Sequence, residues 1–256
     1  MIPIQTKGEF ITAEKFAKRA EQLITSYQKQ APELRCRVEI RADVPGILVS
    51  QGNLLIGKHS RFSVDSIDAT LAHEIETHLL TYFNGTTQPF KQFHLGMANY
   101  EPLQEGLAVF AEYLVGGLTA KRLRDIAARV ITVHSLIAGA DFIQVFKQLN
   151  FEYGFTEHQA FFITMRVFRG GGFTKDAVYL KGISQLLKYL ARGGSLELLY
   201  LGKLAQEHIP LIEELKWRKV LKTNVLTPNF LKNTQTKKLL RRACSGLSVI
   251  ELIKKE

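Results

Sequence analysis

The sequence predicts an α+β fold that is mostly helical and contains one small antiparallel sheet. Three observations predict it. Apolar runs of strand length occur at about 36–57, apolar residues recur at helical spacing from residue 63 onward, and glycines stand where those helices should end. At 256 residues, 46% of them hydrophobic and 23% charged, the chain is long enough to bury a large core. We expect a single catalytic domain over residues 1–256.

The first expected element is an amphipathic helix at about 13–29. Thr12 suits its N-cap, apolar side chains from Phe16 to Tyr27 follow at helical spacing, and Pro32 lies just beyond its end.

The small sheet is expected next. Apolar residues alternate at 36–40, and two apolar runs at 47–49 and 54–56 flank Gly52-Asn53, which indicates a hairpin. Helices should follow at about 64–83, 102–115, 120–138, 141–149, 157–169, 175–191, 196–222 with a break near Pro210, and 234–254. The helices within 64–115 carry the candidate metal ligands, and 120–256 forms a helical C-terminal portion.

The chain is basic, with a formal net charge of +10, and the stretch 202–256 contains twelve Lys and Arg against five Asp and Glu. This excess suits nucleic acid, an acidic protein partner, an acidic substrate, or a basic face that only meets solvent. The two cysteines, Cys36 and Cys244, exclude a disulfide scaffold and a multi-cysteine zinc cluster. The sequence contains neither a leader pattern nor an apolar run of membrane-spanning length, so we expect a soluble cytoplasmic protein with no membrane partner.

A candidate metal site lies in the helix expected at 64–83. His73 and His78 are five residues apart, so at about 100° per residue a regular helix would turn their rings about 140° away from each other. Rings so divergent could not share a tetrahedral ion. A single π-type turn between Ala72 and Leu79 would restore a common face, and we predict that distortion.

The helix expected at 102–115 supplies a third candidate ligand. It is apolar nearly all round and should be buried, so its carboxylate Glu105 has to be paired, bound to metal or neutralised. Gly106 removes a side chain in mid-helix at a cost of about 1 kcal/mol, which the close approach of another helix would explain. The alternative for each histidine is a structural residue in an apolar helix.

Two histidines and one glutamate leave a fourth position for water, as in catalytic zinc sites. Glu74, next to the first histidine, could take a proton from that water and pass it to the leaving amine, so the predicted reaction is amide hydrolysis. Glu74 and Glu76 could instead be solvated helix charges, an interpretation that we favour for Glu76 only.

These motifs resemble a known family. His-Glu-x-x-x-His at 73–78, Gln-Pro-Phe at 88–90 and Gln-Glu-Gly-Leu-Ala at 104–108 look like the microtubule-associated tyrosine carboxypeptidase family. Its bacterial relatives are labelled flavohemoglobin expression-modulating QEGLA-motif proteins. The similarity extends from the small sheet to at least the segment 166–182.

The resemblance implies Zn²⁺ on His73, His78 and Glu105, with Glu74 as the base. It implies a zincin-like metallopeptidase fold with a distorted metal-binding helix. It also implies carboxypeptidase chemistry, since the studied eukaryotic branch removes a C-terminal tyrosine from an acidic tail.

A carboxypeptidase must bind the terminal carboxylate, which arginine does best through its planar fork. Arg166 and Arg169 are candidates, because they close a helix beside the glycines at 170–172; the alternative is that they interact with the helix dipole. Lys175 and Tyr179 lie four apart on one face of the next helix. Tyr179 could donate a hydrogen bond to the oxyanion of the tetrahedral intermediate, or be a half-buried core residue.

The predicted function is a zinc-dependent metallopeptidase that removes one residue, an aromatic one being a candidate, from the C-terminus of a protein or peptide. A rival is a regulatory protein that binds nucleic acid or protein and has a structural or vestigial metal site. No nucleic-acid module, zinc finger or Walker loop is recognisable, which makes nucleic acid the weaker partner. A third candidate is a zinc hydrolase of non-peptide amides. Tyr100 and His94, between the two metal elements, could also line the cleft.

Overall fold

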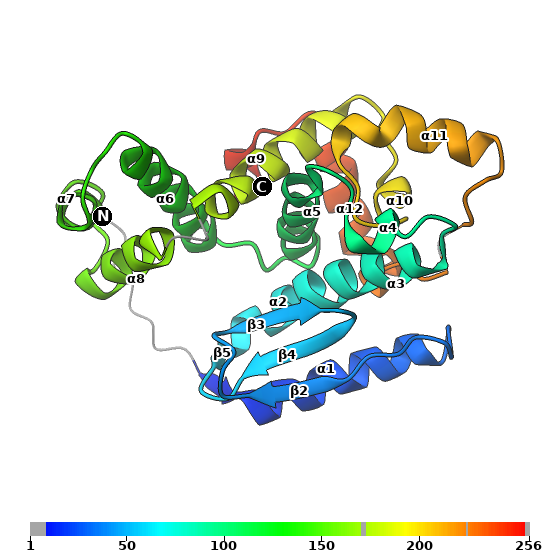
Figure 1. Ribbon diagram of the computed structural model, residues 1–256, viewed down its shortest axis with the longest axis horizontal. Coiled ribbons are helices and arrows are strands. Elements are labelled where there is room, and N and C mark those ends of the chain that lie inside the picture. The colour runs from blue at the N-terminus through cyan, green and yellow to red at the C-terminus, as the bar shows by residue number, and fades with distance from the viewer. Residues whose placement is uncertain (1–8, 170–172, 224, 254–256) are drawn as a thin grey trace.

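The computed structural model describes residues 9–169, 173–223 and 225–253, and over these ranges the protein is α+β and mostly helical, as predicted (Figure 1). Among these described residues, the helices are too short or too polar to cross a membrane. A small sheet lies against one side of the helical rod 67–87, and the helix Tyr100–Leu114 packs with further helices on the other side of that rod.

The three-stranded sheet has the strand order β2-β4-β3, formed by β2 (Val38–Arg41), β3 (Ile47–Ser50) and β4 (Asn53–Gly57). β3 and β4 form the predicted antiparallel hairpin. β2 pairs with β4 in parallel, so the sheet is mixed rather than purely antiparallel. The alternation of apolar residues identifies strands but not their direction, which is why the sequence could not predict this pairing. The order also leaves β3 at an edge of the sheet.

A second strand pair was not expected from the sequence. β1 (Phe10–Thr12) and β5 (Arg61–Ser63) pair antiparallel and frame the first long helix, α1 (Ala13–Gln28). Leu54 and Ile56 point to the same face of β4 and are fully buried in a core that α1 and the metal-binding helix complete.

The metal-binding helix is one continuous rod of three parts. These are α2 (Ile67–His73), a π-helix (Glu74–Leu79) and α3 (Leu80–Thr87). A short helix that the sequence did not predict, α4 (Gln92–Leu95), follows and packs against α3.

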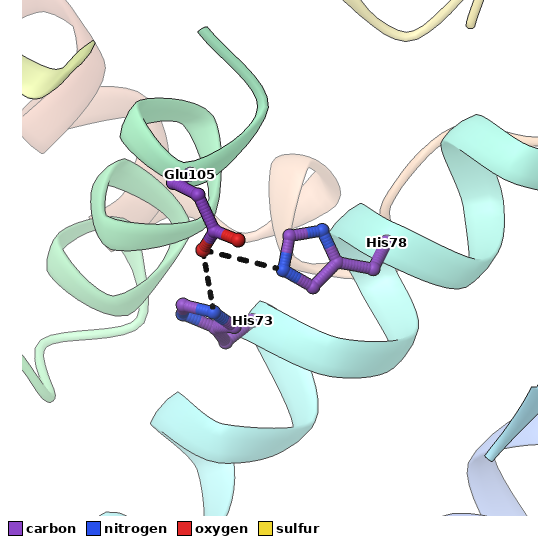
Figure 2. Close-up of side chains that lie close together, drawn as sticks. All are labelled: His73, His78 and Glu105. Carbon is purple, nitrogen blue, oxygen red and sulfur yellow. Dashed lines mark ion pairs between the residues drawn. The ribbon is translucent and has the colours of Figure 1, made fainter. Parts of the chain in front are cut away.

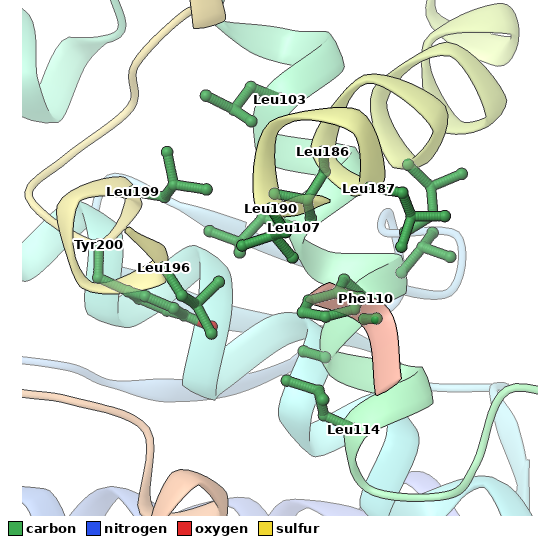
Figure 3. Close-up of a cluster of buried hydrophobic side chains, with 14 of the residues drawn as sticks. Leu103, Leu107, Phe110, Leu114, Leu186, Leu187, Leu190, Leu196, Leu199 and Tyr200 are labelled. Carbon is green, nitrogen blue, oxygen red and sulfur yellow. The ribbon is translucent and has the colours of Figure 1, made fainter. Parts of the chain in front are cut away.

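The main hydrophobic core lies between α5 (Tyr100–Leu114) and α9 (Phe173–Ala191) (Figure 3). α9 begins at Phe173, slightly before the predicted 175. The two helices approach closely at Gly106 and Gly182, where a Cβ atom on Gly106 would lie 2.3 Å from the backbone carbonyl carbon of Gly182. The close approach predicted from Gly106 is thus confirmed, and α5 is buried nearly all round, as its composition indicated.

Three further helices form a satellite group, at the left of Figure 1, with a small core of its own. They are α6 (Ala120–Ile137), α7 (Phe142–Lys147) and α8 (Glu157–Phe168). α6 and α8 also pack against α9, so this group meets the rest of the molecule along that helix.

The C-terminal part departs from the sequence prediction. The prediction of a helix at 196–222 with a break near Pro210 is wrong. The segment forms α10 (Leu196–Leu199), an irregular stretch and α11 (Ile209–Trp217). Pro210 stands in the first turn of α11, where it opens a helix instead of breaking one. The last helix, α12 (Thr234–Cys244), is shorter than predicted. The remaining short elements are the 3₁₀ turns Val64–Ser66, Gln206–His208, Asn229–Lys232 and Val249–Ile253 and the π-helix Gln148–Glu152.

Candidate metal centre

The predicted π turn is present at Glu74–Leu79, between the two histidines. It changes the backbone bonding pattern, and neighbouring hydroxyls supply hydrogen bonds to carbonyls of this segment. The hydroxyl of Thr77 donates to the carbonyl of Ala72 at 2.9 Å, and that of Thr81 donates to the carbonyl of Thr77 at 2.8 Å. Both threonines are fully buried, so these bonds hold the distorted turn in a setting without water.

The turn brings His73, His78 and Glu105 together (Figure 2). One oxygen of Glu105, Oε2, lies 3.6 Å from Nε2 of His73 and 3.7 Å from Nε2 of His78. Two ligands at about 2.1 Å from a tetrahedral ion are roughly 3.4 Å apart, so these separations fit a shared zinc ion. Oε2 is buried and has no hydrogen-bond partner among the described residues, which is costly for a carboxylate unless a cation occupies the space between the three atoms.

His73 is oriented by a carboxylate on α5. Nδ1 of His73 lies 2.8 Å from Oε1 of Glu112. Glu112 in turn accepts two hydrogen bonds from Arg122 of α6, from Nε at 3.1 Å and from Nη2 at 2.9 Å. In the neutral ring, a proton held at Nδ1 by this carboxylate leaves Nε2 as the nitrogen that can bind a metal ion.

His78 is oriented by the neighbouring helix as well. The amide of Gln104 lies 3.1 Å from Nδ1 of His78 and donates to the hydroxyl of Thr81 at 2.8 Å. Gln104 and Glu105 are adjacent in the Gln-Glu-Gly-Leu-Ala motif, so one turn of α5 supplies both the contact to Nδ1 and the carboxylate that faces Nε2.

The protonation of the metal-free centre follows from these contacts. Burial lowers the pKa of His73, but the neighbouring carboxylates of Glu105 and Glu112 outweigh burial and raise the pKa to about 10. Burial raises the pKa of Glu112, whereas His73 and Arg122 lower it to about 2 in total. For Glu105, burial is likewise outweighed by the two histidines, which hold its pKa well below the usual value. The site is therefore built to retain a positive charge beside Glu105.

Glu74 and Glu76 have different surroundings. Glu74 is buried, burial raises its pKa, and its side chain lines the same cavity as the two histidines. Glu76 is also buried, so the solvated role favoured for it is wrong. Its carboxylate accepts hydrogen bonds from the hydroxyl of Tyr27 at 2.5 Å and from the backbone N–H of Asn229 at 2.8 Å, which ties α1 and the C-terminal segment to the π-helix.

The cavity beside the three candidate ligands has a volume of about 170 Å³. It lies between β3, the π-helix, the first turns of α5 and the first half of α9. Tyr179 and Lys175 of α9 line it, as does Tyr100, whereas His94 stands behind it with its ring against that of Tyr82. Burial raises the pKa of Tyr179, so its phenol stays protonated and can donate a hydrogen bond. A larger cavity of about 920 Å³ is lined by Glu76 and α12 instead of by the histidines.

The structure does not bring the two predicted arginines into this cavity. Arg166 pairs with the buried Asp176 at 2.5 Å, which links α8 to α9. Arg169 is exposed at the end of α8, and the glycines at 170–172 that were expected to bring it near a ligand lie outside the described residues.

Sequence reasoning missed three residues of the site, namely Glu112, Arg122 and Lys203. Glu112 had a usable signal, because it stands seven residues after Glu105, two turns further along the same face of an apolar helix. Arg122 had none, since it reads as an ordinary helix cation. Lys203 lines the cavity from the irregular stretch after α10, which had been assigned to a helix.

Comparison with known proteins identifies the family of this chain. A family profile described as "Microtubule-associated tyrosine carboxypeptidase" matches residues 4–247. The rat protein named microtubule-associated tyrosine carboxypeptidase 1 is 33% identical over 181 residues, which cover 65% of this chain and 36% of the rat protein. Its mouse counterpart is 30% identical over 180 residues, covering 66% and 37% respectively. The chain thus spans little more than a third of the length of these relatives. Because the profile match covers nearly the whole chain, the chain belongs to the microtubule-associated tyrosine carboxypeptidase family.

Proposed function

We propose that this protein is a zinc-dependent carboxypeptidase that removes the last residue of a protein or peptide. The observation that carries the proposal is the convergence of His73, His78 and Glu105 across a π turn, with the carboxylate of Glu74 in the same cavity. Membership of a family named for tyrosine carboxypeptidase activity supports the reaction class.

His73, His78 and Glu105 would hold the ion, with Glu112 and Gln104 fixing the two rings. Zinc bound there supplies a Lewis acid and lowers the pKa of an attached water to about 7. Glu74, whose pKa burial raises, accepts the proton of the attacking water and delivers it to the leaving amine. Tyr179 keeps its phenolic proton and donates a hydrogen bond to the developing oxyanion.

A peptide substrate suits the surroundings of the cavity. Ile47, Leu48 and Val49 of β3 line it, and β3 is an edge strand whose outer side meets no further strand in the described ranges. Such an edge is a template for an extended peptide, because main-chain hydrogen bonds can continue the sheet. The apolar and tyrosine side chains at the cavity suit an aromatic residue as the one removed.

The proposal is tested on purified full-length protein. The protein should contain about one zinc per chain. Glu74→Gln should retain the metal and lose peptide cleavage, because the amide cannot accept the proton. Release of one C-terminal amino acid is measured by mass spectrometry, on peptides that end in tyrosine, phenylalanine or alanine.

The rival function makes the opposite prediction. A regulatory protein with a structural metal would bind its nucleic-acid or protein partner unaffected by Glu74→Gln, and it would release no amino acid. Unchanged turnover in Glu74→Gln would also contradict the proposal, since another group would then have to act as the base.

A further inference from the structure

The cavity is lined by a lysine side chain whose role the metal centre does not explain. Two lysines line it, Lys175 on α9 and Lys203 on the stretch after α10. Lys175 is exposed to solvent, whereas Lys203 is partly buried. The arginines near the site do not line the cavity. Arg122 bonds to Glu112, and Arg166 bonds to Asp176. Arg129 lies over the ring of Tyr179, with Cζ 5.7 Å from the ring centroid.

The backbone of Lys203 is fixed in position. Its N–H donates to the carbonyl of Phe93 at 2.7 Å, and its carbonyl accepts from the N–H of Met97 at 3.0 Å. Gly202 allows this contact, because a Cβ atom there would lie 2.5 Å from the carbonyl oxygen of Phe93. The irregular stretch therefore lies against the segment that joins the two metal-binding elements.

The side chain is held between two tyrosine rings. Nζ of Lys203 lies 5.5 Å from the ring centroid of Tyr82 and 5.7 Å from that of Tyr100, within the range of cation–π contacts. Tyr82 stands one turn after His78 and Tyr100 stands five residues before Glu105, so both rings belong to the helices that carry the candidate ligands. Lys203 thus reaches the cavity between side chains of the two helices that carry the candidate ligands.

Lys203 forms no ion pair within the described part of the chain. Burial lowers its pKa, because removing an ammonium group from water without a counter-charge disfavours the charged form. Aromatic faces compensate this loss only in part. A compact anion that enters the cavity would complete the set of contacts.

We propose that Lys203, held between Tyr82 and Tyr100, binds the free C-terminal carboxylate of the substrate and so restricts cleavage to the chain end. The inference rests on the proposed function. Chain geometry favours the partly buried lysine over the exposed Lys175 for this task, because nothing follows the terminal residue and its carboxylate does not have to continue toward solvent. The residues before the cleaved bond must leave toward solvent, where the exposed Lys175 can meet acidic side chains.

The test uses one peptide sequence with either a free carboxylate or an amide at its C-terminus, and zinc-loaded full-length protein. Wild type should prefer the acid. Lys203→Met should lower kcat/KM for the acid by roughly 30-fold or more and for the amide by less than about threefold, since the lost contact involves a charged group. Lys188→Met, which removes an exposed cation of α9, serves as the control and should change neither value. Lys203→Arg should retain part of the preference for the acid.

Equal losses on acid and amide would overturn the inference, because they indicate a structural role for Lys203. No loss on either peptide would overturn it as well. So would a preference for the acid that Lys175→Met removes and Lys203→Met does not. Failure of the proposed function is recognised separately. If wild type cleaves neither peptide, binding of both peptides to zinc-loaded Glu74→Gln is measured by calorimetry. Tighter binding of the acid that disappears in Glu74→Gln/Lys203→Met supports the inference, and equal binding of acid and amide overturns it.

Discussion

Nδ1 of His73 lies 2.8 Å from Oε1 of Glu112, a residue two turns beyond Glu105 on the same face of α5. One helix thus presents one carboxylate toward Nε2 of the ring and another toward Nδ1. The ring of His73 therefore contacts two carboxylates of α5, and Arg122 of α6 holds the outer one in place.

Glu112→Gln should weaken zinc binding by about 10- to 100-fold, because the amide is a poorer acceptor for the Nδ1 proton and leaves Arg122 without its counter-charge. Competition with a chelator of known affinity measures the change. Glu21→Gln, which alters an exposed carboxylate of α1 that does not line the cavity, is the control. An unaltered affinity in Glu112→Gln would mean that the hydrogen bond does not orient the ring.

The metal-free protein should lose stability as the pH rises from about 6.5 to about 10. His73 has a folded-state pKa of about 10, raised against burial by Glu105 and Glu112, above its ordinary value of 6.5. Its contribution to the free energy of unfolding is therefore complete below pH 6.5 and disappears as the pH passes the folded pKa. Urea titrations across this range measure the slope.

His73→Gln is the control for that slope, since it removes the proton at issue; the metal-free variant should be less sensitive to pH in the same window. Zinc affinity of the wild type should rise with pH over this window, because binding displaces the same proton. A flat stability profile of the metal-free wild type would contradict the prediction.

Tyr179→Phe should lower kcat by roughly 100-fold and leave KM and zinc content nearly unchanged, since the lost hydrogen bond would form to the developing oxyanion. The substitution preserves the ring that packs in the core. Steady-state kinetics on the acid peptide measure it, with the exposed Tyr153→Phe as control. A rise in KM of roughly 100-fold with an unchanged kcat would instead mean that the phenol binds the substrate.

Gly182→Ala should destabilise the protein by about 3 kcal/mol or more, or prevent folding, because a Cβ atom there would lie 1.7 Å from the carbonyl oxygen of Pro102 and force α5 and α9 apart. Thermal unfolding of this variant is compared with that of Ser184→Ala, at a half-buried position on the same helix. A melting temperature equal to that of wild type would show that the two helices can separate at little cost.

The parts of the site that could be predicted from the sequence are those set by local helix geometry, namely the spacing of two ligands and the size of one residue in a buried helix. Two histidines five residues apart can share an ion only across a π turn, and a glycine in an apolar helix indicates a close neighbour. Which helix would be that neighbour could not be predicted, because Gly106 meets Gly182 through a contact between segments far apart in the chain.

The position of Lys203 was beyond reach for a similar reason. Hydrophobic periodicity assigned its segment to a helix, whereas backbone bonds to Phe93 and Met97 decide its actual path. The same contact brings the ammonium group of Lys203 to the ring of Tyr82, which follows the histidines in their helix. Periodicity reports which residues avoid water, and it carries no information on which distant segments meet.

The π turn also sets the rotational phase of everything that follows it in the same rod. The amide of Asn84 on α3 bonds to the carbonyls of Tyr200 and Leu226, and Gln88 exchanges two hydrogen bonds with the backbone of Lys222. If the same residues formed a regular α-helix instead of the π turn, everything after the turn would rotate by about 100°, which would separate the two histidines and swing both amides away from these partners. The π turn therefore has two effects. It aligns the histidines, and it directs the side-chain amides that bind the C-terminal segments from which Lys203 reaches the cavity.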